Sequence, residues 1–372
     1  MDSLQYMGNA LLIADTDIVR IHERVYSEIE RSVPEPARDY LRGHQPDAPG
    51  GQNVSRALRS HDPYRFGEFL PFFAIRPLYN ELIYLMNSTG IGLIHSTILI
   101  SSVAYFSLGG VLFVWIRTHA SPLIATVVSL LVMLSSPMTT LGRENTSDAL
   151  ATLVAFTGFF LICERRNLTP GMIVLLTSIY LRTDFVVLAI PVLISCWLKR
   201  RTTFWQTAVL AALAGGSVLL INYFAGDYGI KMLYYRNFVG TPSAPAEMTV
   251  LFTFRDYLSG FRRGITLATD GFFFPFLLIG VTGLVCAPRS RAIFGISLAY
   301  AGLHFLALPN WEERWFVLFY LSMGVVAAMG LGSRQFRRVF FPSTTAGDST
   351  RWTLAASNED YAESVSRVAG GA

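Results

Sequence analysis

The chain has 372 residues and a formal net charge of +4, and it is 52% hydrophobic but only 15% charged. Soluble domains carry about 25% charged residues, so this composition excludes an ordinary soluble globule. The apolar residues come in runs of roughly 16–22, long enough to cross a hydrocarbon core of about 30 Å as helices. Most basic residues lie in short segments between these runs, which is typical of membrane anchors and not of a nucleic-acid surface. We therefore predict an all-α integral membrane protein.

The first part of the chain, residues 1–92, is polar with mixed charge. Within it, 14–31 has apolar residues at helical spacing, and 32–65 is interrupted by prolines and glycines, which indicates a loop. Segment 71–88 is apolar but contains Arg76, Pro77 and Glu81. A charged pair and a proline favour a juxtamembrane helix over a lipid-facing span.

After this region the sequence predicts about nine transmembrane helices. The apolar segments are 93–116, 121–138, 147–163, 169–182, 183–198, 204–225, 271–286, 292–308 and 315–333. They divide the chain into an N-terminal polar region with juxtamembrane helices (1–92), a six-span module (93–225), an outer loop (226–270), three C-terminal spans (271–333) and a disordered cytoplasmic tail (334–372).

Basic residues occupy every second junction between the apolar segments: Arg117, Arg165, Arg166, Lys199, Arg200, Arg201, Arg289, Arg291, Arg334, Arg337 and Arg338. Cytoplasmic loops of membrane proteins carry an excess of lysine and arginine, so we place these junctions in the cytoplasm. The pattern predicts a multi-pass protein of the cytoplasmic (inner) membrane. The three cysteines, Cys163, Cys196 and Cys286, fall near the same side and have no spacing typical of metal sites or disulfides, which favours a packing role.

The opposite junctions each combine an acid with an arginine. The three groups are Arg143 and Glu144 with Asp148, Arg182 with Asp184, and Glu312 and Glu313 with Arg314. A single such pair is more often a helix-end salt bridge, but three on one side of the membrane predict a shared polar site. Arginine suits a phosphate, and the carboxylates suit either general-base chemistry or a divalent cation such as Mg²⁺ or Mn²⁺. We interpret His95 and His304 as packing residues.

Several motifs, each weak alone, occur in an order that resembles the C-type (GT-C) fold of membrane glycosyltransferases that use polyprenyl-phosphate sugars. This group includes protein mannosyltransferases and bacterial lipopolysaccharide-sugar and aminoarabinose transferases. The matching stretches are Asp2 to Tyr6, Arg76-Pro77-Leu78-Tyr79, Arg182-Thr183-Asp184, Tyr234 to Pro242 and Glu313-Arg314-Trp315. The family has a span before its first motif, and we expect this chain to lack that first transmembrane helix.

The resemblance implies transfer of a sugar from a polyprenyl-phosphate donor to an envelope glycan, lipid or protein on the extracytoplasmic side. Asp2 matches the catalytic aspartate, with Asp15 and Asp17 as competitors, and Glu144 matches an acid that assists it. Glu144 and Asp148 would hold a divalent cation, if one is used. The lipid phosphate would be bound by Arg182, Arg314, Arg143 and Arg76, and the substrate side would include Tyr6, Asp184 and Tyr235.

Two other functions stay open at this point. A transporter or flippase of lipid-linked glycan is one, although such proteins tend to have internal repeats and midplane charges, and neither is evident here. An inactive or assembly subunit is the other, and the absence of the first span favours it. The expected partners are the lipid bilayer, the polyprenyl-linked sugar and its acceptor, and not nucleic acid.

Overall fold

The computed structural model describes residues 3–43, 52–226, 234–235, 245–247 and 253–333. Throughout these residues the regular secondary structure is helical, and no strand occurs among them. Asp2, residues 227–233, 236–244 and 248–252 of the predicted outer loop, and the predicted tail 334–372 lie outside the described residues.

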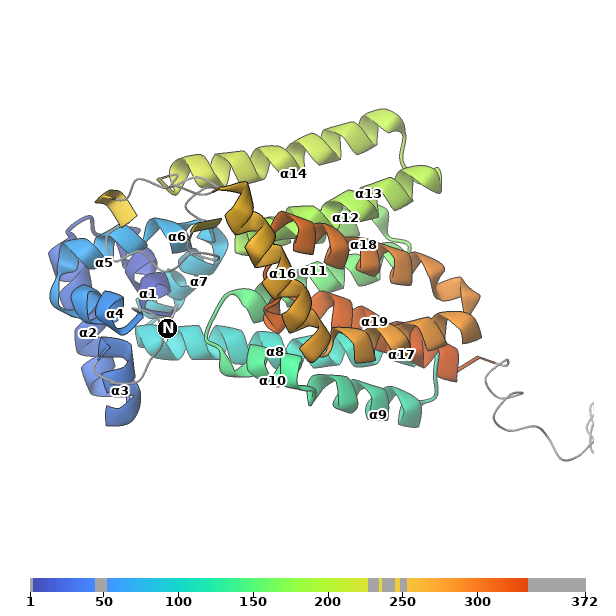
Figure 1. Cartoon of the computed structure of the whole chain (residues 1–372), viewed down its shortest axis with the longest axis horizontal. Coiled ribbons are helices and arrows are strands. Elements are labelled where there is room, and N and C mark those ends of the chain that lie inside the picture. The colour runs from blue at the N-terminus through green and yellow to red at the C-terminus, as the bar shows by residue number, and fades with distance from the viewer. Residues whose placement is uncertain (1–2, 44–51, 227–233, 236–244, 248–252, 334–372) are drawn as a thin grey trace, which may run out of the picture.

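Short helices of the N-terminal region gather at one end of the molecule (Figure 1). They are α1 (Ser3–Leu12), α2 (Ile18–Ser32), α3 (Glu35–Arg42), α4 (Gln52–His61), α5 (Pro63–Phe69), α6 (Pro71–Ala74) and α7 (Pro77–Ser88). The helix predicted at 14–31 is confirmed as α2, whose N-terminus is capped by Asp17. The loop predicted over 32–65 was wrong, because α3, α4 and the start of α5 occupy it.

The remaining helices form a bundle along the long axis of the molecule (Figure 1). They are α8 (Leu93–Arg117), α9 (Pro122–Met133), α10 (Ser136–Arg143), α11 (Asp148–Cys163), α12 (Leu168–Leu181), α13 (Val186–Leu198), α14 (Phe204–Phe224), α16 (Phe254–Asp270), α17 (Phe273–Cys286), α18 (Arg291–Ala307) and α19 (Val317–Leu331). Helix α16 crosses the bundle obliquely and covers the end of α18, where the Tyr257 hydroxyl donates to the carbonyl of Leu306 at 2.6 Å.

Fewer helices can cross a membrane than the nine predicted. Among the described residues, four helical stretches are long and apolar enough, or up to six if each of two bent pairs forms one span. The bends are 65° between α9 and α10 and 64° between α16 and α17. Helix α11 has 16 residues, and α12 and α13 are shorter. Sixteen residues of helix extend about 24 Å, less than a hydrocarbon core of about 30 Å.

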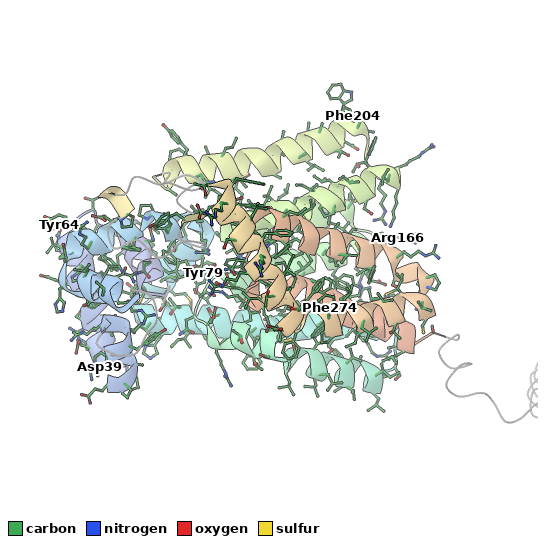
Figure 2. All side chains as sticks on the ribbon, in the orientation of Figure 1. Asp39, Tyr64, Tyr79, Arg166, Phe204 and Phe274 are labelled. Atoms are coloured by element: carbon green, nitrogen blue, oxygen red, sulfur yellow. The ribbon has the colours of Figure 1, made fainter. Side chains whose placement is uncertain are left out.

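Apolar side chains on the outside of the bundle fit a lipid environment. Most of helix α14 is exposed on the outside of the bundle. Its exposed side chains include Trp205 (76% exposed), Leu219 (73%) and Phe224 (76%). Phe204, at the start of the same helix, points away from the molecule (Figure 2). Exposed apolar surface of this extent is costly in water, so the several apolar helices indicate a multi-pass membrane protein.

The bundle is centred on α19, in which every residue from Val317 to Val326 is buried. Helices α11 and α12 approach closely through glycines. A Cβ atom added to Gly158 would lie 2.7 Å from the backbone nitrogen of Leu175 and 2.9 Å from the carbonyl oxygen of Gly171. Small residues that allow backbones to meet in this way are common between membrane helices.

Candidate functional site

Ionisable side chains from the ends of several helices meet at one place in the bundle. Asp148 is the first residue of α11, Glu144 follows α10, and His304 lies in the last turn of α18. Arg182 and Asp184 lie at the junction of α12 and α13, and Arg314 follows Glu312 in a 3₁₀ turn at Glu313–Phe316. We call this set the acid–arginine cluster: Glu144, Asp148, Arg182, Asp184, His304, Glu312 and Arg314.

The inner part of the cluster is centred on Arg182. Its Nε and one terminal nitrogen donate to the two carboxylate oxygens of Asp184, at 2.8 and 2.6 Å. Its other terminal nitrogen lies 3.1 Å from Oδ1 of Asp148. The Nε2 atom of His304 lies 2.8 Å from Oδ2 of Asp184. Because the side chains of Arg182, Asp148 and His304 are only 7%, 4% and 1% exposed, this part of the cluster is nearly closed to solvent.

Arg314 forms the outer part of the cluster. Its Nε donates to Oε2 of Glu312 at 2.8 Å, and a terminal nitrogen donates to Glu144. The same terminal nitrogen lies 3.7 Å from Oδ2 of Asp148. Asp148 therefore links the two arginines. Arg314 is 22% exposed and its partners Glu144 and Glu312 are 34% and 39% exposed, so a ligand can approach the cluster from this side.

The backbone at Arg182 explains how two short helices place these groups. Arg182 has an extended conformation (φ −160°, ψ 108°) that ends α12, and α13 follows after a single 3₁₀ turn. The chain thus reverses with almost no loop and leaves the guanidinium and the Asp184 carboxylate in the turn. Asp148 lies in the first turn of α11, where the helix dipole favours a negative charge.

The charge balance limits what each arginine can do. Two arginines face four carboxylates, which gives the cluster a formal charge of −2 while His304 is neutral. Arg182 is already paired with the carboxylates of Asp148 and Asp184, and it would have to release one to bind a phosphate. Arg314 is nearer the surface and its partners can be solvated if it turns to a ligand. Arg314 is therefore the better of the two for contact with an anion.

One member of the cluster was missed from the sequence. His304 was interpreted as a packing residue because no second histidine is near it in the sequence, yet its ring is bonded to Asp184. Its place in the last turn of a segment predicted to end on the acid–arginine side was the available signal. Glu313, which was grouped with Glu312, is not part of the cluster. Its Oε1 accepts from the backbone nitrogen of Phe272 at 2.9 Å, at the start of α17.

The N-terminal helices adjoin the segment that leads into α11. The hydroxyl of Tyr6, which is fully buried on α1, lies 3.4 Å from Oγ of Ser147. The Arg76 guanidinium lies over the ring of Tyr6, with its central carbon 5.3 Å from the ring centroid. Tyr6 and Arg76, both predicted at the site, are thus packed against each other beside Asp148. Asp2, four residues before Tyr6, lies outside the described residues.

The competing aspartates lie elsewhere and have structural contacts. Asp15 and Asp17 both form ion pairs with Arg20 at 3.0 Å. Asp17 also accepts from the backbone nitrogens of Val19 and Arg20 as the cap of α2. These hydrogen bonds, with that from Arg20 the largest contribution, lower the pKa of Asp17 and make its carboxylate a weaker base. Arg143 is exposed at the end of α10, and Tyr235 is half-buried.

Glu144 and Asp148, the residues predicted to bind a metal ion, are both members of the acid–arginine cluster. Both carboxylates face arginines, which a cation would have to displace. Within the described ranges, no group of three or more histidine, cysteine, aspartate or glutamate residues is placed to hold a metal ion.

Comparison with known proteins adds no relative. No family model, curated protein or solved structure matches this chain.

Proposed function

We propose that this protein is a membrane glycosyltransferase that moves a sugar from a polyprenyl-phosphate donor to a glycan, lipid or protein acceptor of the cell envelope. One observation carries the proposal: residues from three acid–arginine groups, far apart in the sequence, form a single cluster that is buried at Arg182 and open at Arg314. Charges kept near membrane depth usually serve a substrate, because their burial is costly.

In this proposal Arg314 contacts the donor phosphate. A guanidinium can bind two phosphate oxygens at once and stays charged at any physiological pH. Arg182 has a positioning role, because it holds the carboxylates of Asp148 and Asp184 in place. Asp148 in turn orients Arg314 from its buried side.

The reaction requires a base that deprotonates the acceptor hydroxyl and a group that stabilises the departing polyprenyl phosphate. We assign the base to Asp2, on the basis of its sequence motif, and an assisting role to Glu144, which lies at the solvent-accessible rim beside Arg314. The acceptor oxygen bonds to the sugar carbon C1 as its proton passes to the carboxylate. The bond from C1 to the phosphate oxygen breaks, and polyprenyl phosphate leaves with the extra negative charge stabilised by Arg314.

The test is transfer of radiolabelled sugar from polyprenyl-phosphate mannose and polyprenyl-phosphate aminoarabinose in membranes that contain the full-length protein. Asp2→Asn and Arg314→Gln should each reduce transfer by at least about a hundredfold. Arg117→Gln, at the far end of α8, removes the same charge as Arg314→Gln and should leave transfer unchanged.

Wild-type transfer rates in both the Asp2→Asn and Arg314→Gln proteins would refute the assignment. The transporter or flippase alternative makes a different prediction in liposomes. It requires the labelled lipid to cross the bilayer with its sugar still attached, and that result would replace the transferase proposal.

A further inference from the structure

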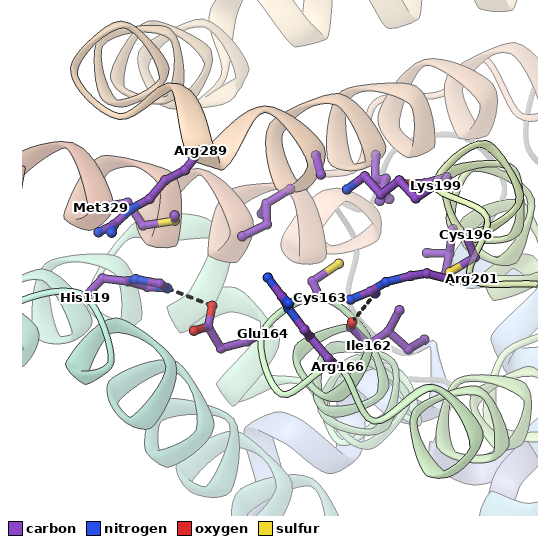
Figure 3. Close-up of a pocket in the computed structure, with 15 residues that line it drawn as sticks. His119, Ile162, Cys163, Glu164, Arg166, Cys196, Lys199, Arg201, Arg289 and Met329 are labelled. Atoms are coloured by element: carbon purple, nitrogen blue, oxygen red, sulfur yellow. Dashed lines mark hydrogen bonds and ion pairs between the residues drawn. The ribbon is translucent and has the colours of Figure 1, made fainter.

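A cavity of about 480 Å³ lies between the ends of several bundle helices (Figure 3). It is bordered by the ends of α11, α13 and α19, the start of α18 and the turn after α8. This volume is in the range of pockets that bind small organic ligands, about 300–1,000 Å³. Its lining includes His119 and the charged residues Glu164, Arg166, Lys199, Arg201 and Arg289.

The cavity has an excess of positive charge. Four of its lining side chains are cationic, and Glu164 is the one carboxylate among the described residues that line it. Glu164 is already engaged, because its Oε2 lies 2.7 Å from Nε2 of His119 and accepts from the Trp115 indole at 3.3 Å. Within the described part of the chain, no carboxylate forms an ion pair with the four cations. Arg201 instead donates to the carbonyl of Ile162 at 2.8 Å (Figure 3).

Two turns beside the cavity have an unusual backbone conformation. Arg166 (φ 57°) and Arg200 (φ 53°) are the two non-glycine residues with positive φ in the described residues, and they follow the ends of α11 and α13. Glycine is the usual residue in this conformation at a helix end, since a side chain there raises the backbone energy. Of these turns, the first places Arg166 along the cavity wall. The second places Arg201, the neighbour of Arg200, along it.

The cavity and the acid–arginine cluster lie at opposite ends of the same helices. Helix α11 runs from Asp148 in the cluster to Cys163 at the cavity, and α18 runs from Ile293 at the cavity to His304 in the cluster. Arg166 lies at the end of the molecule away from the N-terminal helices and Tyr79 (Figure 2). The cavity is therefore a second site and not an extension of the first.

We propose that this cavity binds a phosphate-bearing anion, which is either the headgroup of an anionic lipid or a soluble organic phosphate. Guanidinium and ammonium groups that have no carboxylate partner and surround a concave site are the usual recognition chemistry for phosphate. Basic pockets between membrane helices also suit anionic lipid headgroups. The proposal does not depend on the transferase function.

The experiment compares two double variants of the full chain. In each turn, one variant replaces a cation that lines the cavity, and the other replaces the adjacent cation that does not. The cavity variant is Arg166→Gln with Lys199→Gln, and the matched variant is Arg165→Gln with Arg200→Gln. Each removes one cation after α11, one after α13 and one positive-φ arginine, but Arg165 and Arg200 do not line the cavity. The ligand-induced shift in thermal unfolding is measured against each variant's own ligand-free value.

Two ligand arms distinguish the source of the phosphate. One titrates inorganic pyrophosphate in detergent at constant ionic strength, and the other compares nanodiscs with and without phosphatidylglycerol in phosphatidylcholine. We expect the cavity variant to bind at least about tenfold more weakly in one arm, because each lost charged hydrogen bond is worth roughly that factor, while the matched variant stays within about twofold of wild type. A response to pyrophosphate supports a soluble phosphate, and a response to phosphatidylglycerol alone supports a lipid.

Equal weakening in both variants, or no stabilisation of the wild type in either arm, would overturn the proposal. If the cavity variant does not fold, Arg289→Gln provides a second test. This exposed side chain lines the cavity from the 3₁₀ turn that precedes α18 and makes no hydrogen bond with another described residue. Its expected result is the same weakening in the same arm.

Discussion

Replacing each arginine of the cluster with methionine should affect different properties: Arg182→Met mainly stability, and Arg314→Met mainly sugar transfer. Arg182→Met leaves Asp148 and Asp184 with 4% and 18% side-chain exposure and without their main cation. Removal of one partner from a buried ion pair costs about 3–5 kcal/mol, and His304 and Arg314 still contact the two acids, so we expect a value near 3. Arg314→Met leaves Glu144 and Glu312, which are 34% and 39% exposed and can be hydrated, so we expect about 1 kcal/mol or less.

The assay is the free energy of unfolding in mixed micelles, measured by denaturant titration with circular dichroism, together with sugar transfer on the same preparations. Arg314→Met should reduce transfer strongly with little loss of stability. Arg182→Met should lower the free energy of unfolding by about 2–3 kcal/mol more than Arg314→Met does. Arg255→Met, which removes an exposed arginine of α16, controls for the lost charge. Equal destabilisation by Arg182→Met and Arg314→Met would refute this division into a positioning and a binding residue.

Two further predictions concern the scaffold. Burial lowers the pKa of His22, whose ring packs 4.5 Å from that of Tyr26 and bonds to the carbonyl of Arg59 at 3.0 Å. Because the folded-state pKa is below the ordinary value near 6.5, the unfolded state binds the proton more readily. The contribution of neutral His22 to stability should therefore be fully present above about pH 6.5 and decrease as the pH falls below it. In thermal unfolding between about pH 7.5 and pH 5.5, a His22→Gln protein should lose less stability than wild type. Gly158→Ala should cost about 1–3 kcal/mol of unfolding free energy, since its Cβ would meet the backbone of α12 at 2.7 Å. The Cβ of the control variant Gly110→Ala, on α8, would meet nothing within 4 Å, so this variant should not be destabilised. Equal effects of the two substitutions would contradict the close packing of α11 and α12.

The positions of the helices in the bundle were predicted well from the sequence. The number of these helices that can span a membrane was predicted poorly. Segment 93–116 corresponds to α8 and 204–225 to α14, because long uninterrupted apolar runs leave little alternative to helix. The count of nine failed where apolar runs were short or bent, as at α11, α12 and the α9–α10 pair. Hydropathy records that a segment avoids water, but not whether protein or lipid surrounds it.

The candidate site was predicted in parts and not as a whole. Arg182 with Asp184 was visible as a pair, since two residues of spacing bring them into one turn. That Asp148 joins Arg182 to Arg314 depends on how α11 packs against the ends of α12 and α19, which no local pattern records. The contact of His304 with Asp184 spans 120 residues and was missed for the same reason.

Helix α19 begins at the turn that holds Arg314 and reaches the cavity at Met329, and nearly all of its residues are buried between these points. An insertion of one residue would rotate one end against the other by about 100°. The buried middle of the helix offers no exposed bulge to absorb that rotation. The number of residues between Arg314 and Met329 is therefore as constrained as their identities, and length changes in this chain should be tolerated in loops but not within α19.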